Sequence, residues 1–543
     1  MTEPGAATAT EFIPLHERPE IYNRRWFLLG ILCLSLVMVV MAVSGLNVAL
    51  PSMQRSLNAS ATDLQWIVDS YAIVFAGLLL TAGAIGDRFG RKGALLCGLA
   101  VFALGSLLGA FADSSEAVIV ARATSGIGAA FVMPATLSIL TTVFPPHERA
   151  KAIAIWAGFA GAGGALGPLI AGFLLTGWWI FPSFWWGAVF VVNIVVSGVV
   201  MIAVAVFAPR SKDNSSTPLD PFGAALSLIG VSALLYGIIE GPDRGWGDSY
   251  VVGAFVVAAL MLLIFMWWER RVEHPMLPMP YFRDRRFSTG SGIITFGFLV
   301  MFGFFFVSTQ YFQFVRGYSP LKAGIATLPF ALTMIAVAPR SAGLVQRIGL
   351  NKVVALGFSG IAAGFVVLAF LAPDTPYIVI VGALVLLAGG MALTMPPATG
   401  AIMSSVPLNK AGVGSAVNDT TRELGGALGI AILGSIVASA YRSNVDVSQL
   451  PPEAADAAKE SVGAALGVSQ TLEPSAAAAV VEHAGAAFTD AINVAMAVSA
   501  VISVIAGAIV LYVGRNIARQ PAHAPHPLEQ ESLENRPSEH ESA

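Results

Sequence analysis

The sequence predicts an all-α integral membrane protein with fourteen transmembrane helices. Its 543 residues are 56% hydrophobic and only 12% charged, and the mean hydropathy is +0.74, which excludes an ordinary soluble globular protein. Apolar runs of roughly 20 residues, the length that crosses a bilayer as a helix, recur along almost the whole chain. Lys and Arg fall mainly in alternate connections between these runs.

The expected spans follow one another with mostly short connections. They lie at about residues 26–50, 65–86, 93–112, 117–143, 151–175, 184–207, 221–240, 250–268, 288–313, 323–341, 352–372, 376–403, 411–440 and 488–514. Residues 1–25 form a polar N-terminal tail without the order of basic, apolar and cleavable parts of a signal peptide. Residues 515–543, rich in Pro and Glu, are expected to be a disordered tail.

The basic residues set the orientation. If both tails lie on one side, 21 of the 30 Lys and Arg residues fall in the tails and connections of that side, against 6 on the other. Positive residues favour the cytoplasmic side. Both ends are therefore expected in the cytoplasm, and the connection 441–487 outside it.

A glycine-rich charged turn joins the second and third spans at residues 83–92, Gly-Ala-Ile-Gly-Asp-Arg-Phe-Gly-Arg-Lys. Its glycines would let two helix ends approach closely, while its charged side chains pair or stay in water. The residues expected to matter are Gly83, Gly86, Asp87, Arg88, Gly90, Arg91 and Lys92. A simple topology-setting turn would explain the bases but not the glycine spacing.

The chain also repeats itself. Gln346 to Gly349 follow the tenth span as Asp87 to Gly90 follow the second, an offset of 259 residues, and a Gly and Pro pattern around the fourth span recurs around the twelfth at an offset of 262. Two matches at nearly one offset predict two six-helix halves, residues 26–207 and 288–514, with residues 221–268 as an inserted helix pair.

Three carboxylates within spans are the candidates for proton and cation binding, because all seven histidines lie in loops or tails. They are Asp69 in the second span and Asp419 and Glu423, one helical turn apart, in the thirteenth. An ionisable group at a helix centre costs about 2.5–3.5 kcal/mol on insertion scales, so it needs a partner, a cavity or a function. Purely structural alternatives are a headgroup position for Asp69, close to Trp66, and pairing of Glu423 with Arg422.

Two further features complete the candidate site. Arg122 in the fourth span stays charged and needs an acid, carbonyls or water as partner; we expect it to respond to the protonation of nearby carboxylates. Gly163, Gly167, Pro168 and Gly172 give the fifth span a surface almost without side chains, which favours close helix contact.

These motifs together resemble the major facilitator superfamily. Residues 83–92 match its loop G-x-x-x-D-R-x-G-R-[RK], Arg122 its Arg-bearing motif in helix four, and residues 163–172 its antiporter motif G-x-x-x-G-P-x-x-x-G. Fourteen spans with a central inserted pair are similar to the QacA/EmrB-type drug:proton antiporters over residues 26–514. In the QacA branch, acids matching Asp69, Asp419 and Glu423 are implicated in proton coupling and cation binding.

The resemblance implies a major facilitator fold and a proton-coupled antiporter exporting lipophilic, cationic drugs or amphiphiles from the cytoplasm by alternating access. Ala42 stands where the family usually has an Asp, which favours monovalent or neutral substrates over divalent cations. Expected partners are protons, small substrates and the bilayer of the inner (cytoplasmic) membrane, with no nucleic acid, cofactor or metal, and a monomeric state. The alternatives are an exporter of one endogenous metabolite or lipid-like compound, or, less favoured, a membrane enzyme or sensor on a transporter scaffold.

Overall fold

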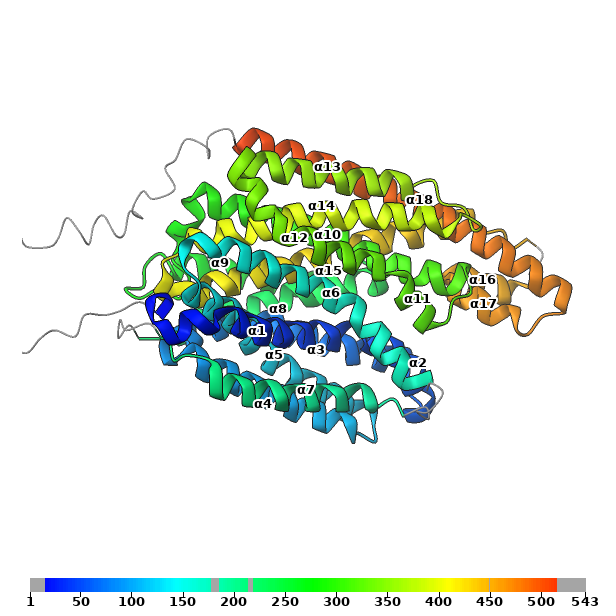
Figure 1. Ribbon diagram of the computed structural model, residues 1–543. Helices are drawn as coiled ribbons and strands as arrows, with labels where there is room; N and C mark the ends of the chain where they lie inside the picture. Colours follow the sequence, from blue (N-terminus) through cyan, green and yellow to red (C-terminus); the bar gives the residue numbers. More distant parts are fainter. Residues whose placement is uncertain (1–14, 177–184, 213–217, 449, 515–543) are drawn as a thin grey trace, which may run out of the picture. The chain divides into compact units, whose positions relative to one another are not determined.

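The computed structural model describes residues 15–176, 185–212, 218–448 and 450–514, and in these ranges all regular structure is helical (Figure 1). Fourteen segments of the described chain are long and apolar enough to cross a membrane. This confirms the predicted number of spans and the all-α class.

The helices form two compact units. Unit 1 contains α1 (Pro19–Ser44), α2 (Leu46–Leu57), α3 (Ala61–Phe89), α4 (Arg91–Ala110), α5 (Ser115–Val143), α6 (Pro146–Thr176) and α7 (Ala188–Phe207), together with Leu408–Ala416. The last of these segments holds a 3-10 turn, η4 (Leu408–Lys410), and the first residues of α15.

Unit 2 contains the later helices. They are α8 (Pro221–Arg244), α9 (Ser249–Trp268), α10 (Arg285–Gln310), α11 (Pro320–Ala326), α12 (Leu328–Ile348), α13 (Leu350–Leu368), α14 (Tyr377–Ser404), α15 (Ala411–Asn444, from Val417 onward), α16 (Pro452–Glu460), α17 (Val462–Ser469) and α18 (Pro474–Gly514). Short turns η2 (Met279–Arg283, 3-10) and η3 (Tyr311–Val315, π) flank α10.

Small residues hold α4 against α5 in unit 1. A Cβ added at Gly128 would lie 2.4 Å from the backbone N of Phe102, and one at Gly98 would lie 2.8 Å from the carbonyl O of Gly128. Real side chains do not approach this closely, so the two backbones touch because neither glycine carries a side chain.

Unit 2 packs α13 against α14 in the same way. A Cβ at Gly390 would lie 2.4 Å from the carbonyl O of Gly357, and one at Gly357 would lie 2.7 Å from the carbonyl O of Gly390. Gly357 follows Gly98 by 259 residues and Gly390 follows Gly128 by 262, the offsets of the sequence repeat. The α4–α5 and α13–α14 pairs thus make the same kind of glycine contact at the offsets of the sequence repeat, as the predicted two halves would.

Several boundaries differ from the sequence prediction. Residues 19–25 of the expected tail belong to α1, which starts at Pro19, a residue whose fixed φ suits a first helical position. The first span breaks at Gly45, between α1 and α2. Much of the expected loop 441–487 is helical, because it holds α16, α17 and the start of α18. The predicted disordered tail, 515–543, lies outside the described residues.

Candidate functional site: a braced turn and buried charges in two units

The turn between α3 and α4 is built on one glycine with a left-handed backbone. Gly90 has φ +119°, which an L-residue with a side chain rarely adopts. Its N–H donates to the carbonyl of Gly86 at 3.0 Å and closes α3, so that α4 can begin at the next residue, Arg91. Gly349 in unit 2, 259 residues later, has φ +86° between α12 and α13.

Asp87 is buried at this turn and accepts hydrogen bonds from three donors. Its Oδ1 accepts the Nε–H of Arg91 and the backbone N–H of Gly412, both at 2.9 Å, and its Oδ2 accepts the N–H of Val413 at 3.1 Å. Gly412 and Val413 lie in the first turn of α15, where free N–H groups and the helix dipole favour an anion. The predicted turn therefore holds the start of a helix more than 300 residues away in sequence.

The neighbouring basic side chains, Arg91 and Lys92, donate hydrogen bonds to backbone carbonyls. Arg91 donates through NH2 to Leu408 O at 2.6 Å, beside the start of α15. Lys92 Nζ donates to Ala205 O, near the end of α7, at 2.7 Å. Gly83 leaves room for the contact, because a Cβ there would lie 2.5 Å from Gly412 O.

The two remaining residues of the predicted turn are Arg88 and Gly86. Arg88 lies 5.4 Å from the ring centroid of the exposed Phe89. A Cβ at Gly86 would lie 3.4 Å from Ala94 Cβ, which is ordinary contact.

Arg122 of α5 is buried against α3. Its Nε donates to the carbonyl of Ile67 at 3.1 Å, and its guanidinium lies 4.2 Å from the ring centroid of Tyr71. Ile67 and Tyr71 are four residues apart and share one face of α3. Asp69, midway between them and half-buried, lies on the opposite face. Of the partners considered from sequence, Arg122 uses a carbonyl, and the Tyr71 ring is a partner that the sequence did not indicate. The structure does not bring Arg122 to Asp69.

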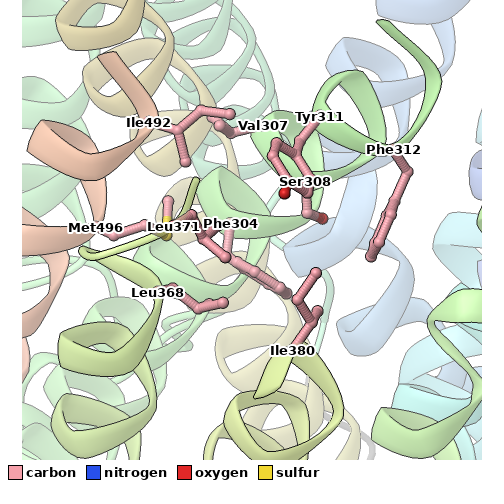
Figure 2. Close-up of a pocket in the computed structure, with 10 residues that line it drawn as sticks. All are labelled: Phe304, Val307, Ser308, Tyr311, Phe312, Leu368, Leu371, Ile380, Ile492 and Met496. Carbon is pink, nitrogen blue, oxygen red and sulfur yellow. The ribbon is translucent and has the colours of Figure 1, made fainter. Parts of the chain in front are cut away.

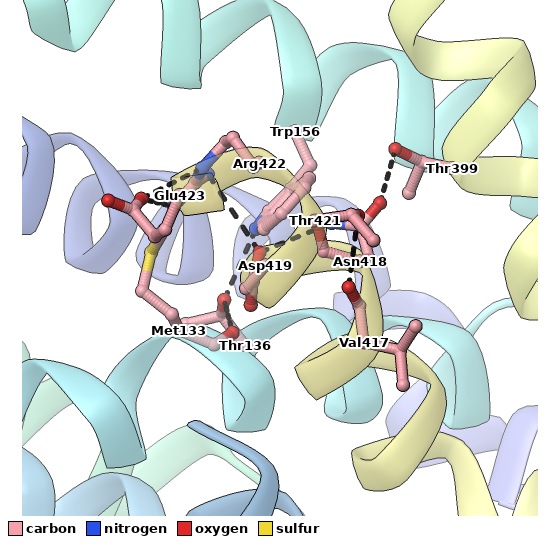
Figure 3. Close-up of polar contacts among 10 residues, drawn as sticks. All are labelled: Met133, Thr136, Trp156, Thr399, Val417, Asn418, Asp419, Thr421, Arg422 and Glu423. Atoms are coloured by element: carbon pink, nitrogen blue, oxygen red, sulfur yellow. Dashed lines mark hydrogen bonds and ion pairs between the residues drawn. The ribbon is translucent and has the colours of Figure 1, made fainter. Parts of the chain in front are cut away.

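The acids of α15 form a charged cluster in unit 2 (Figure 3). Arg422 lies between them: its NH1 is 3.8 Å from Asp419 Oδ1, and its NH2 is 3.3 Å from Glu423 Oε1. Asp419 is fully buried, whereas the Glu423 side chain keeps 20% of its surface exposed. Asp419 and Glu423 are one helical turn apart in the sequence, and in the structure both lie next to Arg422.

A polar chain that the sequence reasoning missed supports Asp419 (Figure 3). Asn418 Nδ2 donates to Asp419 Oδ1 at 3.2 Å, and Asn418 Oδ1 accepts the hydroxyl of Thr399, on α14, at 2.9 Å. Asp419 Oδ2 is buried with no hydrogen-bond partner among the described residues. The only sequence signal was an Asn directly before a candidate acid.

The glycine face of α6 packs on α1. A Cβ at Gly167 would lie 2.0 Å from Ser44 Oγ, and one at Gly163 would lie 3.0 Å from Val40 Cβ. The carbonyl of Gly163 accepts the Ser44 hydroxyl at 3.4 Å, directly before α1 breaks at Gly45. Pro168 and Gly172 continue α6 after this contact.

One small cavity lies within unit 2 (Figure 2). Ten residues of α10, η3, α14, α18 and the C-terminal end of α13 line it: Phe304, Val307, Ser308, Tyr311, Phe312, Leu368, Leu371, Ile380, Ile492 and Met496. Its volume is about 20 Å³, close to the space of one or two waters. Tyr311 donates its hydroxyl to Ala372 O at 3.0 Å, so the cavity has little polar chemistry to offer a ligand.

Comparison with known proteins agrees with this architecture. The chain is 34% identical to the multidrug efflux pump LfrA of Mycolicibacterium smegmatis over 90% of its own length and 96% of that protein. It is 32% identical to the methyl viologen resistance protein SmvA of Salmonella typhimurium over 87% of its length and 95% of that protein.

Among solved structures, the human organic anion transporter MFSD10 (TETRAN) superposes with a TM-score of 0.56 at 13% identity, covering 89% of this chain and 99% of that one, which is a likeness of fold. The sequence model described as Major Facilitator Superfamily matches residues 32–430. The matching sequence model and these relatives, together with the turn at residues 83–92 and the glycine contacts of α4–α5 and α13–α14, lead to one conclusion. The chain belongs to the major facilitator superfamily.

Proposed function

We propose that the protein is a proton-coupled antiporter that exports lipophilic, cationic drugs or amphiphiles across the cytoplasmic membrane. One observation carries the proposal: Asp419 is fully buried, one of its carboxylate oxygens has no hydrogen-bond partner in the described chain, and Arg422 stands between it and Glu423. The names of the relatives, a multidrug efflux pump and a methyl viologen resistance protein, support the class of substrate.

The cluster can exchange a proton for a cation. With both acids ionised, it carries one net negative charge, because Arg422 offsets only one of them. A cationic substrate or a proton can supply the missing positive charge, but the two compete. When one proton enters for one monovalent cation that leaves, no net charge crosses, so the pH gradient supplies the driving force. With a neutral substrate, the entering proton also gains about 2.3 kcal/mol per 100 mV of membrane potential.

The turn at Asp87 would act as a brace during the transport cycle. Two of its three hydrogen bonds, from the N–H groups of Gly412 and Val413, hold the first turn of α15, and the acids of the cluster lie further along the same helix. In alternating access such a brace has to form in one state and release in another. Both termini are proposed to lie in the cytoplasm, as the distribution of basic residues indicates, and the protein to work as a monomer.

Transport in everted membrane vesicles tests the proposal. A pH gradient should drive accumulation of a lipophilic cationic dye, and Asp419→Asn should lower its rate at least tenfold. Asp490→Asn is the matched control, because Asp490 is an exposed acid on the α18 span. Gradient-driven transport that survives in a triple variant, Asp69→Asn with Asp419→Asn and Glu423→Gln, would overturn the coupling.

The range of substrates separates a multidrug exporter from a dedicated one. The proposal expects transport of several unrelated cationic and amphiphilic compounds in the same vesicles. Transport of a single compound from such a panel would replace it with export of one endogenous metabolite or lipid-like molecule.

A further inference from the structure

The residues that flank the helix hairpin α8–α9 in unit 2 include two buried carboxylates. Asp220 precedes α8 and is 8% exposed, and Glu269 follows α9 and is 3% exposed. Both lie just outside the apolar spans. Neither belongs to the cluster or the turn used in the proposed transport cycle.

Both carboxylate oxygens of Asp220 accept hydrogen bonds. Its Oδ1 accepts the N–H of Gly223 at 2.9 Å and caps the start of α8. Its Oδ2 accepts the indole Nε1–H of Trp268, the last residue of α9, at 2.8 Å. One carboxylate thus ties the first turn of α8 to the last turn of α9.

Only one of the two carboxylate oxygens of Glu269 has a hydrogen-bond partner among the described residues. Its Oε2 accepts the N–H of Leu277 at 2.9 Å, whereas its Oε1 is buried with no hydrogen-bond partner among the described residues. A Cβ added at Gly223 would lie 2.3 Å from Asp220 Oδ2 and 2.8 Å from Glu269 Oε1. The two oxygens therefore face the same small space above Gly223.

Two ionised carboxylates in one buried space repel each other and lose hydration. A proton on Glu269 Oε1 removes one charge and turns the unpartnered oxygen into an O–H donor for which Asp220 Oδ2 is the nearby acceptor. Glu269 Oε1 has no hydrogen-bond donor among the described residues. Of the charged and titratable residues that follow Glu269, Arg270, Arg271 and Glu273 are exposed and His274 is half-buried, and the guanidinium of Arg271 lies 4.7 Å from the ring centroid of Trp267.

The titration of Glu269 agrees with this geometry. Burial raises the pKa of Glu269 to about 7, the charge of Asp220 acts in the same direction, and the N–H groups of Leu277 and Met276 oppose it. The carboxyl group is then about half protonated at neutral pH.

We propose that Asp220 and Glu269 form a proton-binding site of their own, in which Glu269 Oε1 carries the proton and donates it in a hydrogen bond to Asp220 Oδ2. When the proton leaves to solvent, the two anions repel. This repulsion loosens the contact between the α8–α9 hairpin and the segment from Arg270 to Asp284, which leads into α10. The contact between the α8–α9 hairpin and the rest of unit 2 therefore weakens as pH rises and the site loses its proton.

Trp268 reports on the site, because its indole donates to Asp220 Oδ2. The full chain labelled with 5-fluorotryptophan in lipid nanodiscs gives a fluorine resonance for Trp268, assigned by its loss in Trp268→Phe. Without substrate, this resonance should titrate with a midpoint near pH 7, in line with the pKa of Glu269. Glu269→Gln should remove the transition, and Glu273→Gln is the matched control that should keep it.

The variant Asp220→Asn distinguishes two explanations. In one, Asp220 and Glu269 share a proton; in the other, Glu269 has only a structural role. Without the neighbouring negative charge the midpoint should move to lower pH, whereas a structural role predicts no shift. The wild-type titration and the Asp220→Asn shift decide the matter even if Glu269→Gln does not fold.

A resonance that does not titrate between about pH 5 and 9, or the same midpoint in Asp220→Asn, would overturn the proposal. Asp419→Asn should leave the transition unchanged. A failure of the transport assay and a failure of this site can therefore be told apart.

Discussion

Asp87 Oδ1 accepts the backbone N–H of Gly412 at 2.9 Å, so a carboxylate at the end of α3 holds the N-terminus of α15. Asp87→Asn keeps the shape but removes the charge that Arg91 and the helix N-terminus stabilise. A hydrogen bond to a charged group contributes about 1.5–3 kcal/mol. We expect the rate of dye export to fall at least tenfold, as measured in everted vesicles at matched protein levels.

Asp113→Asn is the control for this substitution, because Asp113 is an exposed acid between α4 and α5. It should leave export unchanged. Normal export by Asp87→Asn would mean that the brace on α15 does not take part in the transport cycle.

The glycine contact in unit 2 can be tested by two adjacent substitutions. Gly390→Ala places a Cβ 2.4 Å from Gly357 O, whereas Gly389→Ala meets nothing within 4 Å. Overpacking of this kind costs about 1–3 kcal/mol. Thermal unfolding of the purified protein should show a lower Tm for Gly390→Ala and no loss for Gly389→Ala. Equal Tm values would show that α13 and α14 accommodate the added methyl group without any loss of stability.

Arg122 and Tyr71 should be coupled energetically, because the guanidinium lies 4.2 Å from the ring centroid. A double-mutant cycle with Arg122→Lys and Tyr71→Leu, followed by thermal unfolding, should give a coupling energy of about 0.5–2 kcal/mol. Additive effects would mean that Arg122 is held by the Ile67 carbonyl alone.

The stability of the protein should depend on pH through Glu269. Its pKa is about 7 in the folded protein and 4.5 as the reference value, so the folded state binds more protons between these limits. Stability must then fall as pH rises through this window. Relative to Glu269→Gln, the wild type should lose Tm from about pH 4.5 to 7 and change little above it. A constant difference between the two proteins would contradict the raised pKa.

Apolar run length was enough to predict the number of helices, because a bilayer requires each span to satisfy its own backbone. It did not reveal the single turn residue Gly45 between α1 and α2, because one apolar span runs through it from Pro19 to Leu50. The connection 441–487 was expected to be an external loop with room for one amphipathic helix, because its short helices are too small or too polar to register as spans.

The sequence indicated the residue types of the candidate site better than their partners. The spacing of Asp419 and Glu423 correctly placed both on one helical face. By contrast, the two backbone N–H groups that donate to Asp87 lie 325 and 326 residues away, and only the fold brings them to it. Glu269 was passed over because it opens a strongly basic connection, where an acid looks like ordinary surface charge.

The continuity of α15 ties the two charged sites together mechanically. Gly412 and Asp419 are seven residues apart on one helix, or about 10 Å at 1.5 Å per residue. Because a helix this short does not stretch, we expect any axial shift that a charge change causes at Asp419 to reach the amides of Gly412 and Val413 as well. We therefore expect a substitution at Asp419 to alter the hydrogen bonds at Asp87, and a substitution at Asp87 to alter the charged cluster around Asp419.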